Sequence, residues 1–206
     1  LNLLSLNKDT LNHFFDLKDD MVKMIDQNFD NGSENIQLKL IHILGGLPSE
    51  RAQQFLQSIV LSECISLRGA SLRALHSLKI KSDQAFLDKL SNQIMAETTY
   101  LKEQERLLSM TPTVKTTELL RDVLRRIINL SIVRLMNALA LYYYNKNFYK
   151  AKLALDTGKE SDISYAVELI DSLLSSEHKK VISPLLNTLY FAEAKEQLLL
   201  DCPIYF

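Results

Sequence analysis

Tryptophan is absent from this 206-residue sequence, which also has only two cysteines, five glycines and four prolines. Cys64 and Cys202 stand far apart and belong to no paired motif, which excludes a disulfide scaffold and a cysteine-based structural zinc site. A reducing, cytoplasmic location is the simplest expectation from so few cysteines. No stretch alternates strictly between apolar and polar residues or is a run of β-branched residues, so we predict essentially no β-sheet.

An excess of charge of either sign is also missing. The 24 Lys and Arg residues and 25 Asp and Glu residues give a net charge of −1. Nucleic-acid-binding domains usually carry a clear basic excess, and adhesion to an anionic membrane surface needs one too, so both roles are disfavoured. The sequence starts at Leu1 without an initiator methionine or a signal peptide, and we expect a fragment of a longer cytoplasmic protein.

Residues 127–144 form an apolar stretch that has the length of a membrane span. The stretch contains Asn129, Arg134 and Asn137, and an arginine at mid-membrane costs about 3 kcal/mol on insertion scales. A buried helix of a soluble repeat bundle explains the same pattern without that cost, and we favour it. In such a bundle Arg134 is expected to reach a carboxylate or a helix C-terminus.

Three helices are predicted in the first part of the chain from apolar residues at helical spacing. The first ends at Asn31-Gly32, which is expected to form a left-handed cap. Ser33 begins the second helix, which stops at the Gly-Gly-Leu-Pro sequence of residues 45–48, and Ser49 caps the third. Their predicted buried residues are Leu11, Phe14, Phe15, Met21, Val22, Ile25, Phe29, Ile36, Leu40, Ile43, Leu44, Ala52, Phe55, Leu56, Ile59 and Val60.

Longer helices follow. One is predicted over residues 83–108, and a second runs from Thr116 or Thr117 to Tyr144 after a break at the Met-Thr-Pro-Thr sequence of residues 110–113. Ser161 is expected to cap another helix, and Pro184 should kink the last helix or mark its first turn. Their predicted buried residues are Phe86, Leu87, Leu90, Ile94, Met95, Leu101, Ile163, Ala166, Val167, Ile170, Leu173, Leu174, Val181, Ile182, Leu185, Leu186 and Leu189.

The sequence contains an internal repeat. Residues 35–44 align without gaps to residues 69–78, and a weaker third copy covers residues 164–173. The offset between the first two copies suits a helix–turn–helix unit stacked on its neighbour. The matched pairs are Leu38 and Leu72, Lys39 and Arg73, Ile41 and Leu75, His42 and His76, and Leu44 and Leu78.

The first two copies look like generic HEAT repeats, and residues 134–186 carry a more specific pattern. An arginine-led helix (RLMNALALYY) precedes a helix reading DISYAVELIDSLL and a basic helix reading KKVISPLL. This order resembles the HEAT-repeat region attached to bacterial proteins related to ATP:ADP antiporters. The resemblance implies a cytoplasmic extension of a membrane protein or a free relative of that extension, but no transport activity, because the transporter spans are missing.

We therefore predict an all-α fold, a right-handed HEAT-like α-α superhelix of stacked antiparallel helix pairs. Residues 1–206 form a single domain in this prediction, with a subdivision near residues 110–116.

Arg121, Arg125 and Arg126 are the candidate partner-binding residues. Arg121 and Arg125 lie one helical turn apart, so they share a face that suits phosphate or an acidic partner. In the other interpretation, which we favour, the arginines pair with Glu118, Asp122 and acids of neighbouring helices.

No catalytic residue, cofactor or metal ligand is predicted. The serines lack a nucleophile elbow, and no glycine-rich phosphate loop occurs. His42 and His76 share a repeat position, which indicates equivalent packing rather than a metal site. The polar residues expected on solvated faces are Glu97, Glu103, Glu105, Asp122, His13 and His178.

Aromatic residues gather at the end of the long apolar helix. Aromatic residues beside cations can stack nucleobases. Consecutive helical residues point in different directions, however, so Tyr142, Tyr143 and Tyr144 cannot form one platform. We expect them to pack, with Phe148 and Tyr149, at a corner between helices.

These features favour a non-enzymatic protein-interaction or scaffold domain that binds a protein partner and no small-molecule substrate. One alternative is a HEAT-like nucleic-acid-binding domain related to DNA glycosylases, which would need a basic groove and a catalytic carboxylate. The other is a HEAT-type cofactor lyase or chaperone, although no residue identifies a cofactor.

Overall fold

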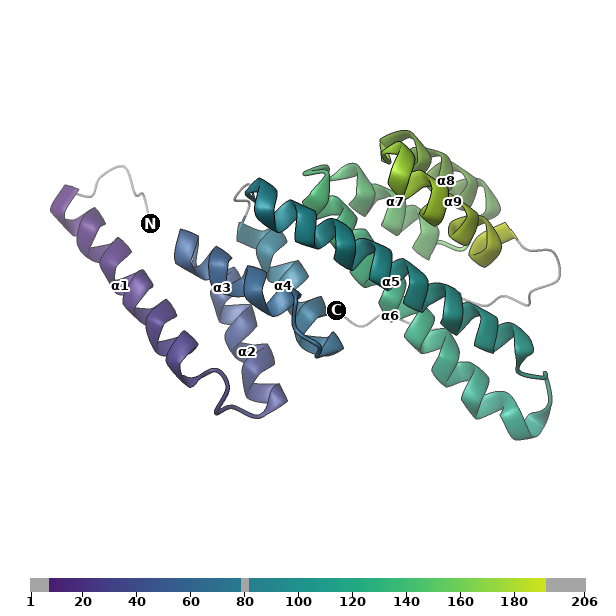
Figure 1. The fold of residues 1–206 in the computed structure, drawn as a ribbon, viewed down its shortest axis with the longest axis horizontal. Coiled ribbons are helices and arrows are strands. Elements are labelled where there is room, and N and C mark those ends of the chain that lie inside the picture. The colour runs from purple at the N-terminus through teal and green to yellow at the C-terminus, as the bar shows by residue number, and fades with distance from the viewer. Residues whose placement is uncertain (1–7, 79–81, 192–206) are drawn as a thin grey trace. The chain divides into compact units, whose positions relative to one another are not determined.

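The computed structural model describes residues 8–78 and 82–191, with side chains from residue 18 onward. This described part consists of α-helices and a short 3₁₀ helix without any strand, which confirms the all-α prediction (Figure 1). The chain divides into two compact units, Leu1–Phe86 and Leu87–Phe206. Residues 110–116, where the sequence indicates a subdivision, lie inside the second unit, between its first two helices.

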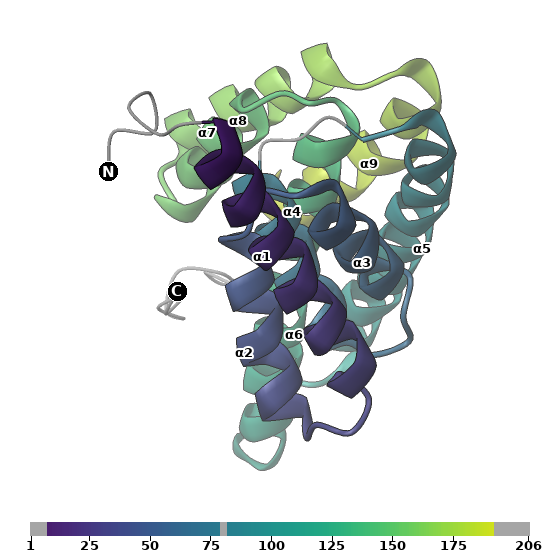
Figure 2. The same cartoon turned by 90° about the vertical axis from the view of Figure 1, so that its left-hand side faces the viewer.

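In the described part of the first unit, four complete helices form two layers. Helix α1 contacts α3, α2 contacts α4, and α3 also contacts both α2 and α4. Figure 2 shows α1 and α3 side by side. Alternate helices are therefore neighbours, as in stacked helix pairs. The four helices are α1 (Lys8–Asn28), α2 (Glu34–Gly45), α3 (Glu50–Val60) and α4 (Ile65–Leu78).

The two copies of the repeat lie on α2 and α4, which pack directly against each other. Ile41 and Leu75 occupy equivalent repeat positions, and both are buried. A Cβ on Gly45 would lie 3.0 Å from both the Cα and the Cβ of Ala74. Gly45 therefore does more than end α2, because its missing side chain lets the backbones of the two repeat helices approach closely.

The inward face of α2 agrees with the prediction at Leu44 and at the repeat position Ile41, but not at Ile36 and Ile43. Ile36 and Ile43 are 51% and 43% exposed, whereas Ile41 and Leu44 are buried. Ile36 and Ile43 are seven residues apart, so they share a face, and this face points away from α4. Met21 on α1 is also exposed. Leu11, Phe14 and Phe15 lie outside the residues whose side chains are described.

The helix caps confirm some of the sequence predictions. Ser49 is the N-cap of α3, and its hydroxyl accepts a hydrogen bond from the Ala52 amide at 3.1 Å. The left-handed cap at Asn31-Gly32 is wrong, because among the described residues only Tyr144 (φ 46°) and Gly158 (φ 67°) are left-handed. Ser161 is not a cap either, since its helix begins one residue earlier, at Glu160.

The second unit is a chain of contacting helices. Helix α6 contacts α7, α7 contacts α8, and α8 contacts α9. Pro184 lies inside α9, as predicted. The elements are α5 (Gln84–Met110), whose first residues belong to the first unit, η2 (Lys115–Thr117), α6 (Glu118–Tyr142), α7 (Asn147–Asp156), α8 (Glu160–Leu173) and α9 (Ser176–Phe191).

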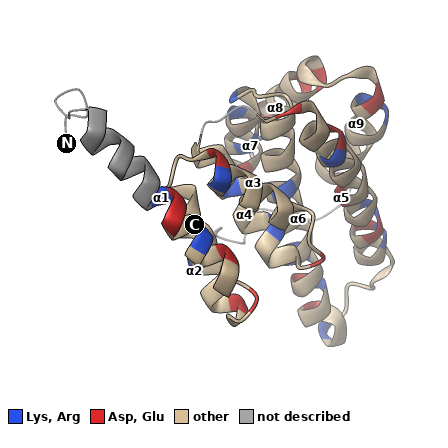
Figure 3. Cartoon of the chain, turned by 60° about the vertical axis from the view of Figure 1, so that its left-hand side comes forward, with Lys and Arg blue, Asp and Glu red and all other residues tan. Residues whose placement is uncertain are grey.

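The second half of α6 is the centre of this unit. Every residue from 131 to 141 is buried, which accounts for the continuous apolar run in the sequence. None of the helices in the described ranges combines the length and the apolar character that crossing a membrane requires. Charged residues of both signs are interspersed along the helices (Figure 3).

Candidate functional site

A buried ion pair joins α5 and α6. The Arg134 guanidinium donates to Glu97 Oε1 from Nη2 at 2.6 Å and from Nε at 3.0 Å, and to Ser131 Oγ at 2.7 Å. This confirms the prediction that Arg134 reaches a carboxylate. The prediction that Glu97 is solvated is wrong, because Glu97 follows Ile94 by one turn on the buried face of α5.

A second buried polar cluster surrounds His178, which the sequence analysis placed at the surface and which is 1% exposed. Its Nε2 lies 3.0 Å from Ser91 Oγ on α5, and its Nδ1 lies 2.7 Å from the Tyr143 hydroxyl. A neutral imidazole satisfies both contacts, because one nitrogen donates while the other accepts. His178 precedes Ile182 and Leu185 on one helical face, so spacing along α9 indicates its burial better than its charged neighbours do.

The aromatic side chains around His178 pack as predicted, at a corner between helices. Tyr142 meets the imidazole ring edge-on at 5.0 Å, and Tyr143 stacks on Phe148 at 5.5 Å. Tyr144 differs from the prediction, because it is exposed at the left-handed end of α6. The amide of Asn145 donates to Ala140 O and that of Tyr144 to Leu141 O, which together form a Schellman cap without glycine.

The stability of the second unit is expected to fall when the pH drops below about 6.5. Burial lowers the pKa of His178, and this outweighs the opposite effect of Glu177. The unfolded chain then binds a proton that the folded chain does not, so stability is full above the ordinary histidine pKa and is lost below it. Tyrosine fluorescence reports urea unfolding of this unit, because all eight tyrosines lie at or beyond Tyr100.

His178→Asn is the matched control for this measurement. The variant should be less stable than wild type near neutral pH, yet its urea midpoint should change less between about pH 7.5 and pH 5.5. An equal change in both proteins would contradict a role for His178 in the pH dependence.

The three candidate arginines lie in the first half of α6 and differ in their contacts. Arg121 donates to the backbone carbonyls of Thr111 at 2.5 Å and of Leu108 at 3.4 Å, at the end of α5. Arg125 pairs with Asp122 at 2.9 Å, and Arg126 is exposed. Arg125 thus has an acidic neighbour of the kind that the favoured interpretation predicts, and Arg121 binds carbonyl oxygens at the end of α5.

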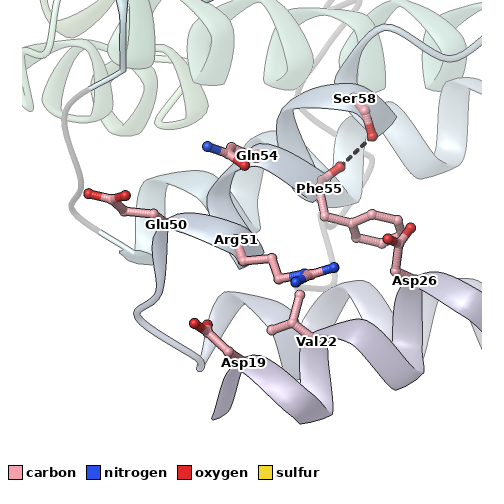
Figure 4. Close-up of a pocket in the computed structure, with 8 residues that line it drawn as sticks. All are labelled: Asp19, Val22, Asp26, Glu50, Arg51, Gln54, Phe55 and Ser58. Carbon is pink, nitrogen blue, oxygen red and sulfur yellow. Dashed lines mark hydrogen bonds between the residues drawn. The ribbon is translucent and has the colours of Figure 1, made fainter. Parts of the chain in front are cut away.

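The first unit contains an open groove of about 570 Å³ between α1 and α3. Sequence reasoning did not identify it, because it depends on how two separate helices pack. Arg51 extends from α3 toward α1, with its guanidinium above Val22 and between Asp19 and Asp26 (Figure 4). The lining residues are Asp19, Val22 and Asp26 of α1 and Glu50, Arg51, Gln54, Phe55 and Ser58 of α3.

Carboxylates dominate the charge of this groove. Its three acidic residues outnumber the single arginine, and Oδ1 of Asp19 is buried without a hydrogen-bond partner in the described part of the chain. Phe55 and Val22 add an apolar component. The Ser58 hydroxyl donates to Phe55 O of its own helix at 2.7 Å, so it is not presented to a base as a nucleophile. The arrangement suits binding of a cationic group beside an apolar one.

Metal-ligating residues do not cluster in the described ranges: no three His, Cys, Asp or Glu residues come close enough to hold an ion. His42 and His76 are both exposed. His13 lies outside the residues whose side chains are described.

Comparisons of the chain with protein-family models, with curated proteins and with solved structures find no match. The resemblance to HEAT repeats and to the antiporter-associated region therefore rests on the sequence pattern alone.

Proposed function

We propose that this chain is a non-enzymatic protein-interaction domain of the scaffold class, which binds a basic segment of a partner protein in the groove between α1 and α3. The observation that carries the proposal is the groove itself, which places three carboxylates and one arginine around an apolar floor. A lysine or arginine of a partner would gain a carboxylate neighbour there, while an adjacent apolar residue would contact the partly exposed Phe55.

We further propose that the helices form a HEAT-like stack of pairs and that the domain is cytoplasmic. The direct packing of α2 on α4 and the repeat carried by these two helices are consistent with a stacked-repeat architecture. Such folds bind other macromolecules along the surfaces of their helices. We extend the proposal to a cytoplasmic region of a larger, membrane-attached protein on the sequence resemblance alone.

The test is fluorescence anisotropy with two labelled amphipathic peptides that share a leucine stripe and differ only in having lysine or glutamate beside it. The lysine peptide should bind more tightly, and its affinity should weaken as salt is added, because salt screens exposed charges. Asp19→Asn combined with Asp26→Asn should weaken binding about three- to tenfold, since exposed ion pairs contribute about 0.2–1 kcal/mol each.

The control is Asp20→Asn combined with Asp30→Asn, which changes the net charge equally outside the groove lining. Equal weakening by the two double variants would show a general charge effect and would overturn the groove as the site. Tighter binding of single-stranded or duplex DNA than of the lysine peptide would favour the nucleic-acid-binding alternative.

A further inference from the structure

The first half of α6 exposes an apolar face that no other described element covers. Leu120, Val123 and Leu130 are 52%, 47% and 48% exposed, and Ile127 between them is partly exposed. We call Leu120, Val123, Ile127 and Leu130 the α6 seam. Leu119, at the edge of the seam, is 78% exposed. The neighbouring flank of the same half-helix, about 100° around its axis from the seam, is packed against the protein, since Leu124 and Ile128 are buried.

The spacing of the α6 seam matches a helix-binding surface. Its members follow one another by three, four and three residues, which is the spacing of positions a and d in a coiled coil. Such residues form a straight stripe along one side of a helix, where the side chains of a second helix interdigitate with them. The apolar arc of this half of α6 is therefore wider than the part that its own fold buries, because only the flank with Leu124 and Ile128 is covered.

The charges around the α6 seam favour an acidic partner. Arg126 is exposed and lies about 80° around the helix axis from the centre of the seam, so it flanks the seam, whereas Arg121 and Arg125 lie on the far side of α6. Asp122 is already paired with Arg125. The seam also starts beside the N-terminus of α6, where the helix dipole adds partial positive charge.

A second copy of the chain fits this surface poorly. In an antiparallel pair of α6 helices, a two-fold axis brings the same flank of both helices together. If Leu120 lies level with Leu130 of the other copy, the two-fold axis passes at position 125. Each Arg126 is then one residue from this axis, on opposite sides of it. Because a helix rises about 1.5 Å per residue, the two Arg126 side chains would be only about 3 Å apart along the helix axis. This places like charges together at the centre of the interface.

We propose that the α6 seam is a second docking surface, which binds an amphipathic helix with acidic residues beside its apolar stripe. The bound helix lies along α6, with its apolar residues between those of the seam and its carboxylates facing Arg126 and the N-terminal end of α6. This surface belongs to the second unit and is independent of the groove in the first, so the chain would hold an acidic and a basic segment at separate places.

The test uses the full chain and three fluorescein-labelled leucine-stripe peptides, flanked by glutamate, glutamine or lysine, in anisotropy titrations. The glutamate peptide should bind about tenfold more tightly than the glutamine peptide, which corresponds to about 1.4 kcal/mol. Val123→Asp should abolish its binding. Leu153→Asp, at an exposed leucine on α7, is the matched control and should leave binding unchanged.

Arg126→Glu keeps the α6 seam intact and therefore tests the charge argument separately. The variant should bind the glutamine peptide as wild type does. It should lose the preference for the glutamate peptide. Unchanged preference for the glutamate peptide would overturn the acidic-partner assignment.

Absence of binding by all three peptides, or tighter binding of duplex DNA, would overturn the proposal. Sedimentation showing a wild-type dimer that Val123→Asp dissociates would identify a second copy as the occupant instead. Asp19→Asn with Asp26→Asn should not affect the glutamate peptide, which separates failure of this proposal from failure of the groove.

Discussion

Replacing Arg134 with alanine is expected to lower the free energy of unfolding of the second unit by about 3–5 kcal/mol. Arg134 and Glu97 are both buried, and the guanidinium holds Glu97 Oε1 with two hydrogen bonds. Removing the arginine leaves a carboxylate in a nonpolar interior without its counter-charge, and the cost of that isolated charge is larger than the lost packing alone. Ser131 also loses its partner, since its hydroxyl accepts the third hydrogen bond.

The measurement is urea unfolding followed by tyrosine fluorescence, which reports the second unit. Arg125→Ala is the matched control on the same helix, because Arg125 pairs with an exposed Asp122 and such pairs contribute at most about 1 kcal/mol. Arg134→Met combined with Glu97→Met should recover much of the loss, since an apolar pair leaves no buried charge behind. Equal costs for Arg134→Ala and Arg125→Ala would contradict a buried pair.

The helices were predictable because their signals are local. Apolar residues at helical spacing, the Gly-Gly-Leu-Pro stop after α2 and the Ser49 cap act within a few residues, and the structure places helix ends at or near each of them. The caps that failed were also local predictions. Asn31-Gly32 has the composition of a left-handed cap, but the structure has that conformation at Tyr144, a residue type that rarely adopts it.

Buried polar residues were less predictable because their partners are far away in the sequence. Glu97 pairs with a residue 37 positions later, and Ser91 meets His178 across 87 positions. Helical spacing places both Glu97 and His178 on buried faces, but residue type alone favours the surface for each. Arg134 was recognised because it interrupts an apolar run, which is a signal within its own helix.

The groove and the α6 seam differ in how much of each can be recognised from the sequence. The groove requires α1 and α3 to lie side by side, and nothing in either helix alone indicates this. The α6 seam is visible in the spacing of Leu120, Val123, Ile127 and Leu130, but the same spacing would be produced by a buried helix. Only the observed exposure distinguishes an unused face from a core face.

Replacing Ile41 or Leu75 with alanine should each lower the free energy of unfolding of the first unit by about 2–5 kcal/mol. These residues hold equivalent positions on α2 and α4, the two helices that carry the repeat, and both are buried. Truncation removes apolar contacts and leaves a cavity that the neighbouring backbone cannot readily fill, because α2 and α4 already approach closely at Gly45 and Ala74.

Ile43→Ala is the internal control for this prediction, since Ile43 lies on the same helix but is 43% exposed. Its cost should stay within about 1 kcal/mol, because surface substitutions change stability little. Urea unfolding is followed by far-UV circular dichroism, while tyrosine fluorescence shows whether the second unit is affected. If Ile43→Ala were as costly as Ile41→Ala, the face of α2 that carries Ile43 would be buried as well. If Leu75→Ala were harmless while Ile41→Ala was costly, the two repeat positions would not be equivalent in packing.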